Sequence, residues 1–269
     1  MDNLRKFHNW VKTKLLTKAT KYIEHKQSNK KINLLDLAVG RGGDLHKWNK
    51  LNIDTVIGID IDKPSIEEAN KRYTTHKFYK TKVNLHAYDL RNPAADQFIQ
   101  KYYNNIKFDI ISCQFALHYF FESKEIFNSL MKLVSNRLNK GGLFIGTTLD
   151  GKKIQELLKN TNISKGRLYT IKKNYEDDRT NLYGKMYQMT IGKTDDKSKS
   201  YFAFAGESSE YLVDINELVR IANKNNMKLV GYKSFRKLYE TYKQETHKQM
   251  TPDEKIPSFL NFSFVFQKI

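Results

Sequence analysis

A glycine-rich turn directly after an apolar run is the feature that most constrains the fold of this chain. Residues 34–39 read LLDLAV, and glycines follow at positions 40, 42 and 43. Glycine tolerates positive φ and lets the backbone approach a ligand, and the free N–H groups of the helix expected over 44–52 face the same space. A second apolar run, 55–59, ends in Asp60, whose carboxylate can accept ribose hydroxyls. The pattern predicts a turn that binds a nucleoside-containing ligand. Because the G-x-G-x-x-G spacing is missing, a tight turn serving another ligand is the alternative.

The alternation of apolar runs with helical patterns predicts an α/β fold. Strands are expected near 33–39, 54–60, 83–88, 108–113 and 142–148, and helices near 44–52, 64–75, 95–104, 123–138 and 151–160. This rhythm is typical of a parallel, doubly wound sheet, which binds ligands beyond the carboxyl ends of its strands.

After residue 160 the alternation of strands and helices gives way to short β-like segments. The β-like pieces at 167–173, 185–192 and 201–204 predict a small β insertion over 161–206, and the core elements then resume with a helix at 214–225 and strands at 228–232 and 259–267. The expectation is seven core strands, the first five parallel, in a single domain over 1–269.

Charge and cysteine content narrow the class of protein. The formal net charge of +18 favours a polyanionic partner such as RNA, DNA or an acidic membrane, although basic residues spread along the chain are also typical of a solvated surface. Cys113 is the only cysteine, which excludes an intramolecular disulfide and a cysteine-based zinc site. The single cysteine also indicates a reducing, intracellular compartment. Because the longest apolar stretch, 108–121, is interrupted by polar residues, a soluble protein is expected.

Five motifs, in order and spacing, carry a resemblance to a known family. They are FHNWVK at 7–12, GGDLHKW at 42–48, SCQFALHYFFES at 112–123, GGLFIGTT at 141–148 and EYLV at 210–213. Together with the glycine turn, which looks like motif I of the S-adenosylmethionine-dependent methyltransferases, they resemble the cellular and viral mRNA cap guanine-N7 methyltransferases. The resemblance implies a Rossmann-like class I methyltransferase fold, S-adenosyl-L-methionine as methyl donor, S-adenosyl-L-homocysteine as product and 5′-capped mRNA as substrate.

The resemblance also assigns site residues. The positions matching those that hold S-adenosylmethionine are Lys12, Ala38, Gly40, Asp60, Asp89, Gln114 and Tyr119. The positions matching those around the capped RNA end are His8, Asn9, His118, Tyr119, Glu210 and Asn261. The chain departs from the family pattern at Ala38 and Val39, at Leu149 where proline is usual, and at Asn261 where tyrosine is usual. A one-residue slip would place Phe262 there instead.

The chemistry of guanine fits these residues without the family. Its Watson–Crick edge presents two donors that one carboxylate such as Glu210 can accept, although a solvated surface acid is the other interpretation of this residue. The aromatic run 118–121 can stack on a base, or it can belong to the core, as lone histidines such as His118 usually do. Because N7 carries a lone pair, no general acid or base is expected, and His118, Tyr119 and Glu210 would only position the reactants. No metal is expected.

Three functions are therefore compared. The first is transfer of a methyl group from S-adenosylmethionine to N7 of the terminal guanosine of GpppN-capped RNA; the second is methylation of another RNA base or a small molecule; the third is a catalytically silent RNA-binding subunit of a capping complex. The first is favoured because the cap-side motifs accompany a complete cofactor motif set. The chain would be a free protein or one domain of a larger capping polypeptide, alone or with other capping subunits. The composition suggests an AT-rich genome, which fits a large DNA virus or a eukaryote. The expected location is cytoplasmic for a viral source, which is preferred, and nuclear for a cellular one.

Overall fold

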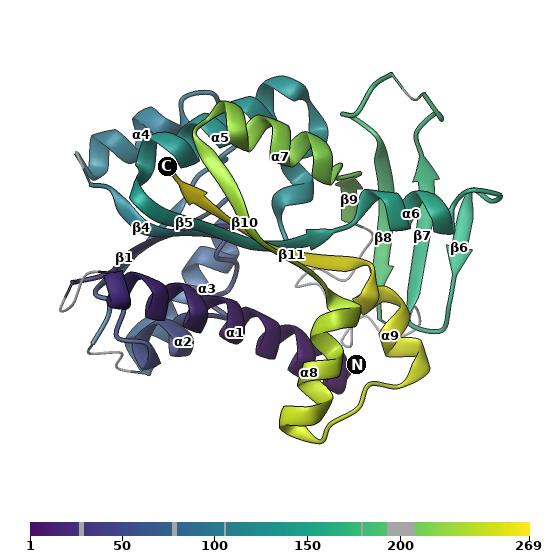
Figure 1. Cartoon of the computed structure of the whole chain (residues 1–269), viewed down its shortest axis with the longest axis horizontal. Helices are drawn as coiled ribbons and strands as arrows, with labels where there is room; N and C mark the ends of the chain where they lie inside the picture. The colour runs from purple at the N-terminus through teal and green to yellow at the C-terminus, as the bar shows by residue number, and fades with distance from the viewer. Residues whose placement is uncertain (27–29, 77–79, 105, 179, 193–207) are drawn as a thin grey trace.

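A seven-stranded sheet forms the centre of the computed structural model, which describes residues 1–26, 30–76, 80–104, 106–178, 180–192 and 208–269 (Figure 1). In spatial order its strands are β10 (Met227–Ser234), β11 (Asn261–Lys268), β5 (Leu138–Leu149), β4 (Phe108–Gln114), β1 (Asn33–Leu37), β2 (Thr55–Asp60) and β3 (Lys82–Ala87). The five strands β1 to β5 are parallel, and β11 runs antiparallel to both of its neighbours. The predicted α/β fold and its seven strands are confirmed.

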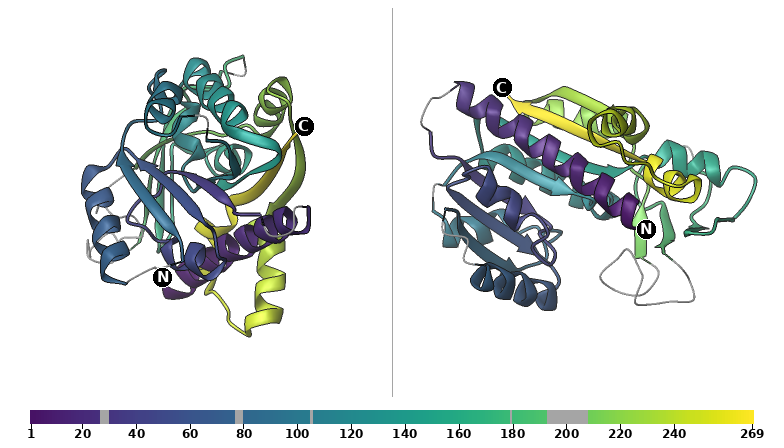
Figure 2. Two further views of the ribbon diagram at one scale, coloured as in Figure 1. Left: turned by 90° about the vertical axis from the view of Figure 1, so that its left-hand side faces the viewer. Right: turned by 90° about the horizontal axis from the view of Figure 1, so that it is seen from below.

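The central strands carry apolar side chains on both faces, and helices cover both faces of the sheet. On one face lie α1 (Asp2–Lys26), α2 (Leu45–Lys50) and α3 (Lys63–Thr75); on the other lie α4 (Ala95–Tyr102), α5 (Lys124–Arg137) and α7 (Ile215–Lys224) (Figure 2). Strand β4 accordingly reads as a continuous buried run, as a strand covered on both sides should. From β1 the strand order runs through β2 to β3 on one side and through β4 to β5 on the other. This reversal of strand order leaves a crevice at the carboxyl ends of β1 and β4.

Helix α1 was not among the predicted elements. Its apolar side chains recur at helical spacing, and Leu16, Ala19 and Ile23 pack against the sheet. The first half of the helix carries Phe7 and Val11 into a second cluster, formed with α8 (Phe235–Thr246). Helix α1 therefore places the 7–12 motif beside the carboxyl ends of the strands.

A second sheet of four antiparallel strands follows α6 (Gly151–Leu157). Its strands are β6 (Ile163–Lys165), β7 (Tyr169–Asn174), β8 (Met186–Ile191) and β9 (Ser208–Tyr211). The predicted strands at 167–173 and 185–192 correspond to β7 and β8, whereas the predicted piece at 201–204 lies outside the described residues. The sheet extends past the predicted boundary at 206 because β9 pairs with β8, and this pairing puts Glu210 on the sheet.

Two short helices, α8 and α9 (Pro252–Phe259), connect β10 to β11, and neither was predicted. Helix α9 begins with a capping box, in which Thr251 and Glu254 satisfy each other's backbone N–H groups. A 3-10 helix, η1 (Leu117–Glu122), follows β4 directly. Within the described ranges, none of the helices is both long and apolar enough to span a bilayer.

Candidate active site

The glycine turn leaves open space at the carboxyl end of β1. Gly40 and Gly42 adopt φ of +53° and +70°, which glycine tolerates without strain. A Cβ at Gly42 would lie 2.7 Å from the Leu45 side chain, whereas a Cβ at Gly40 would meet nothing within 4 Å. Gly42 is therefore needed for the turn itself, and the backbone of Gly40 is accessible to a ligand.

A cavity of about 220 Å³ opens at the ends of β1, β2 and β3 and beside η1. Four of the predicted cofactor residues line it: Ala38, Asp60, Asp89 and Tyr119. Most of the remaining lining is apolar, including Ile61 and Tyr88, which suits a flat aromatic ring such as a purine. Asp60 and Asp89 can accept hydrogen bonds from ribose hydroxyls, and the apolar lining can hold a purine, so the residues of the cavity fit an adenosine.

The carboxylate of Asp60 is fixed by the backbone of the turn. Its Oδ2 accepts a hydrogen bond of 2.7 Å from the Gly40 N–H, and its Oδ1 accepts one of 3.0 Å from the Asp62 N–H. Each carboxylate oxygen keeps a second lone pair. Asp60 can therefore hold the turn and accept two hydroxyl groups at once.

Asp89 is held by Arg91, a residue that the sequence analysis missed. The Arg91 guanidinium donates to both carboxylate oxygens, at 3.0 and 2.9 Å, and these bonds lower the pKa of Asp89. The same guanidinium donates at 3.0 Å to Glu122, at the end of η1. An arginine two residues after a predicted site carboxylate was the available signal, since arginine and carboxylate side chains frequently form bidentate pairs.

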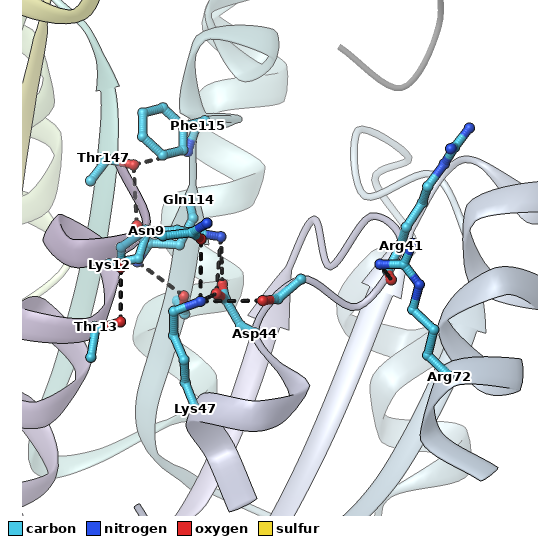
Figure 3. Close-up of polar contacts among 12 residues, drawn as sticks. Asn9, Lys12, Thr13, Arg41, Asp44, Lys47, Arg72, Gln114, Phe115 and Thr147 are labelled. Atoms are coloured by element: carbon cyan, nitrogen blue, oxygen red, sulfur yellow. Dashed lines mark hydrogen bonds and ion pairs between the residues drawn. The ribbon is translucent and has the colours of Figure 1, made fainter. Parts of the chain in front are cut away.

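Lys12 joins α1 to the glycine turn through Asp44 (Figure 3). Its Nζ lies 3.0 Å from Asp44 Oδ2, and the Nζ of Lys47 lies 2.6 Å from Oδ1 and 3.4 Å from the Asn9 side-chain oxygen. Although burial acts to raise it, the two lysines lower the pKa of Asp44 overall. Neither Lys12 nor Gly40 is among the residues lining the cavity.

Gln114 lies at the end of β4 within a chain of hydrogen bonds that also appears in Figure 3. Its side-chain oxygen accepts from Thr147 at 3.1 Å, and its amide donates to Ser112 at 3.2 Å. Thr147 in turn accepts from the N–H of Phe115, which has φ of +57°. The network fixes the chain where β4 turns into η1.

A buried histidine and a buried carboxylate face each other between η1 and β9. The Nε2 of His118 lies 3.8 Å from Oε1 of Glu210, and the two side chains are 3% and 0% exposed. Glu210 accepts hydrogen bonds from Ser208 at 2.7 Å and from Tyr187 at 3.1 Å. Both ring nitrogens of His118 lack a hydrogen-bond partner within the part of the chain that is described. Burial lowers the pKa of His118 despite the nearby carboxylate, so its imidazole is neutral at pH 7.

An orphaned buried imidazole is costly unless a ligand supplies its partner. Leaving a buried polar group unpaired costs about 1–3 kcal/mol. Tyr119, whose ring centroid lies 4.3 Å from that of His118, connects this pair to the cavity, because Tyr119 also lines the cavity. The structure therefore brings the predicted residues His118, Tyr119 and Glu210 together beside the cofactor-side residues.

His8 and Asn261 each have structural partners. His8 Nε2 lies 2.9 Å from the Ser258 hydroxyl, and its ring stacks on Phe115. Burial lowers the pKa of His8 to about 3. The Asn261 amide donates to the carbonyls of Pro257 and Ser258, closing the end of α9. Both stay predictions as cap contacts.

Metal ligands do not gather in this site. Among the described residues, no group of three or more histidine, cysteine, aspartate or glutamate side chains is arranged to hold an ion.

Comparison with known proteins identifies relatives across the chain. The model of the mRNA (guanine-N(7))-methyltransferase domain family matches residues 1–256. The mRNA cap guanine-N(7) methyltransferase of Schizosaccharomyces pombe is 38% identical over 145 residues, which are 54% of this chain and 38% of that protein. The protein of the same name from Drosophila melanogaster is 28% identical over 256 residues, 91% of this chain and 56% of that protein. The chain thus spans between 38% and 56% of the length of these two relatives.

Solved structures share the fold at low sequence identity. An S-adenosylmethionine-dependent methyltransferase from Clostridium acetobutylicum superposes with a TM-score of 0.57 at 16% identity, covering 93% of this chain and 90% of that one. A putative S-adenosylmethionine-dependent methyltransferase from Listeria monocytogenes gives a TM-score of 0.55 at 13% identity, covering 95% and 99%. These neighbours bear out the Rossmann-like methyltransferase fold.

Proposed function

Because the chain belongs to the mRNA (guanine-N(7))-methyltransferase domain family, we propose that it transfers a methyl group from S-adenosylmethionine to N7 of the terminal guanosine of 5′-capped RNA. The observation that carries the proposal is the buried pair of His118 and Glu210 beside the cavity that Asp60 and Tyr119 line. Neither side chain is among the residues lining that cavity, so we assign the pair to the methyl acceptor and not to the cofactor.

The free lone pairs of Glu210 match guanine. Ser208 and Tyr187 each use one lone pair on a different carboxylate oxygen, so each oxygen keeps one for the N1–H and 2-amino donors of the base. Adenine lacks this pair of donors and would leave the carboxylate unpaired. The arrangement therefore selects guanine at the position of the methyl acceptor.

The neutral imidazole of His118 complements the rest of the base. A neutral histidine has one N–H donor and one acceptor, and O6 of guanine accepts. A hydrogen bond to O6 would supply the partner that His118 lacks. Glu210 would bind the N1–H and 2-amino groups and His118 would bind O6. These contacts would fix the orientation of the base and leave N7 free to react.

S-adenosylmethionine would supply an electrophilic methyl group on a sulfonium, held by the cavity residues Ala38, Asp60 and Asp89. Guanine N7 has an in-plane lone pair, so no side chain has to remove a proton first. The residues of this chain then act by alignment and by excluding water. Proximity of this kind reaches roughly 7–11 kcal/mol in favourable cases.

The experiment is incubation with methyl-labelled S-adenosylmethionine and GpppA- or GpppG-ended RNA, followed by digestion to single nucleosides. Label in 7-methylguanosine from the cap is the expected product. Label in an internal base, or in a small molecule added in competition, would replace the proposal with the second function considered above. Binding of capped RNA with no transfer would favour the silent subunit.

A further inference from the structure

A groove with a basic rim and an aromatic floor lies between α6, α8 and α9. Its volume is about 570 Å³, larger than that of the cavity lined by Asp60 and Tyr119. Neither the cofactor side nor the cap side described above uses it.

Cations from three helices meet in this groove. Lys153 comes from α6, Arg236 from α8 and Lys255 from α9, and Glu156 is the single carboxylate among the lining residues. Arg236 and Lys255 form no ion pair in the described part of the chain; each cation lies over an aromatic ring instead. Lys153 lies 3.8 Å from the carboxylate of Asp150, which is not among the lining residues, so among the described residues the cations left without an ion pair in the groove are Arg236 and Lys255.

Phe259 contributes an aromatic ring to the lining of the groove, and we call this part of the lining its floor. The Arg236 guanidinium lies 5.2 Å from the centroid of the Phe259 ring, and Ile256 beside it is 42% exposed. Lys153 donates a hydrogen bond of 2.7 Å to the carbonyl of Phe259, which fixes a cation above the same residue. Aromatic rings and guanidinium planes beside cations are the surface on which single-stranded nucleic acids stack their bases.

The groove adjoins the segment of chain that carries two of the residues packed at the predicted cap side. Ser258, one residue before Phe259, contacts His8, and the carbonyl of Leu260 accepts from the N–H of Asp150 at 2.8 Å. The segment 258–261 thus has the predicted cap residue Asn261 at one end and the floor of the groove beside it. The groove therefore lies close in the chain to the predicted cap residue Asn261, although Asn261 and Ser258 are themselves buried.

Resting on the proposed function, we propose that this groove binds the first nucleotides of the RNA chain beyond the cap. The phosphates lie against Lys153, Arg236 and Lys255, and a base stacks on Phe259. RNA is favoured over an acidic protein segment because the proposed substrate itself carries phosphates next to its cap, and because the floor combines an aromatic ring with a guanidinium.

The test compares two variants with the same change of formal charge. The groove variant carries Arg236→Glu and Lys255→Glu; the control carries Lys132→Glu and Lys228→Glu, exposed positions on α5 and β10. For each, KM is measured for a short capped RNA and for the cap dinucleotide GpppG, and binding of the RNA is followed by fluorescence anisotropy over a range of salt. The readout is the ratio of the two KM values, which expresses the advantage of the RNA chain.

The groove variant should lose about tenfold or more of that advantage, and the control should keep it. The slope of log affinity against log salt should fall by about 0.7 for each phosphate contact removed. A separate variant, Phe259→Leu, keeps the apolar packing but removes the ring, and should weaken RNA binding by about five- to a hundredfold.

Other results would overturn the inference. An unchanged ratio in the groove variant, or an equal loss in the control, would mean that the groove has no particular part in RNA binding. Capture of an acidic peptide by the wild-type groove with no effect of the variants on RNA would assign it to a protein partner. Anisotropy needs no turnover, so groove-dependent RNA binding by a wild-type chain that transfers no methyl group would contradict the proposed function and support the groove.

Discussion

At the scale of single residues, Asp60 shows how one side chain serves both the fold and the ligand. Its two oxygens hold the N–H groups of Gly40 and Asp62, so the carboxylate keeps the glycine turn in place before any ligand arrives. Only the second role, the contact with ribose, is predicted from the sequence. The two roles predict graded behaviour on substitution.

Asp60→Ala should weaken S-adenosylmethionine binding by about ten- to a hundredfold, because one charge-assisted hydrogen bond is worth about 1.5–3 kcal/mol. Asp60→Asn keeps one oxygen acceptor, so its affinity for S-adenosylmethionine should lie between those of Asp60→Ala and the wild type. Isothermal titration calorimetry measures the affinity, with circular dichroism as the control for folding. Wild-type affinity in a folded Asp60→Ala protein would remove this residue from the site.

Glu210→Gln should narrow the difference in kcat/KM between a guanosine cap and an inosine cap, which lacks the 2-amino donor. In the wild type we expect the inosine cap to be poorer by about five- to a hundredfold, since one carboxylate oxygen is left unpaired. The hydroxyls of Ser208 and Tyr187 can rotate to accept from the new amide, so the variant should fold. Tyr187→Phe is the matched control, because it removes an anchor and keeps the carboxylate. Equal discrimination in wild type and Glu210→Gln would separate this residue from base recognition.

His8 should make stability depend on pH. Its pKa is lowered to about 3 by burial, with a smaller effect of Lys12, against 6.5 when unfolded. Below pH 6.5 the unfolded chain therefore binds a proton that the folded chain does not, so stability is lost as the pH falls. Between pH 7 and pH 5 this should cost about 2 kcal/mol.

Urea unfolding at both pH values measures the effect of His8. His8→Gln keeps a hydrogen-bonding group for Ser258 and should lose about 2 kcal/mol less than the wild type over this interval. The exposed His25→Gln should behave like the wild type. Identical losses in all three proteins would show that His8 does not stay neutral in the folded state.

At the scale of elements, the parallel strands were predictable from the sequence, whereas helices α1, α8 and α9 were not. Strands β1, β2 and β4 are buried along most of their length and appear as mainly apolar runs broken by few polar residues, a signal that local sequence carries. Helices α1 and α8 bury a narrow apolar face among many lysines, so their periodicity is diluted.

The residues of the candidate site likewise fall into those predictable from local sequence and those brought together by tertiary packing. Turn residues such as Gly40 and Asp60 follow from local sequence, whereas the approach of His118 to Glu210 depends on β9 pairing with β8 across the second sheet. The link from Arg91 to Glu122 likewise joins two elements distant in the chain. Contacts of this kind are set by tertiary packing.

Arg91→Met should weaken S-adenosylmethionine binding by up to about fivefold, because Asp89 loses the guanidinium that orients it and the three side chains are partly exposed. The effect should shrink at high salt. Adding Glu122→Gln to Arg91→Met should change the affinity little further if the arginine is the link between the two carboxylates. Additive losses in the double variant would mean that Glu122 acts on the site independently.

At the scale of the whole molecule, the positive charge should favour long substrates. Capped RNA should bind more tightly than a cap dinucleotide at low salt, and the advantage should decline as salt rises, because each neutralised phosphate releases counterions. Titrations of both ligands at several salt concentrations check this. Equal affinities that do not respond to salt would mean that the net charge of +18 has no part in RNA binding.

The position of β11 has a consequence for the order of assembly during synthesis. This strand is the last of the seven to be translated, yet it lies between β5 and β10 and pairs with both. Until β11 emerges from the ribosome, β10 has no strand to pair with. Helices α8 and α9, which connect β10 to β11, cannot yet take their final place at this edge of the sheet. Strands β1 to β5, with the glycine turn, are complete long before. A nascent chain can therefore assemble the half that holds Asp60 first, whereas the basic groove at Phe259 forms only when the final strand is inserted.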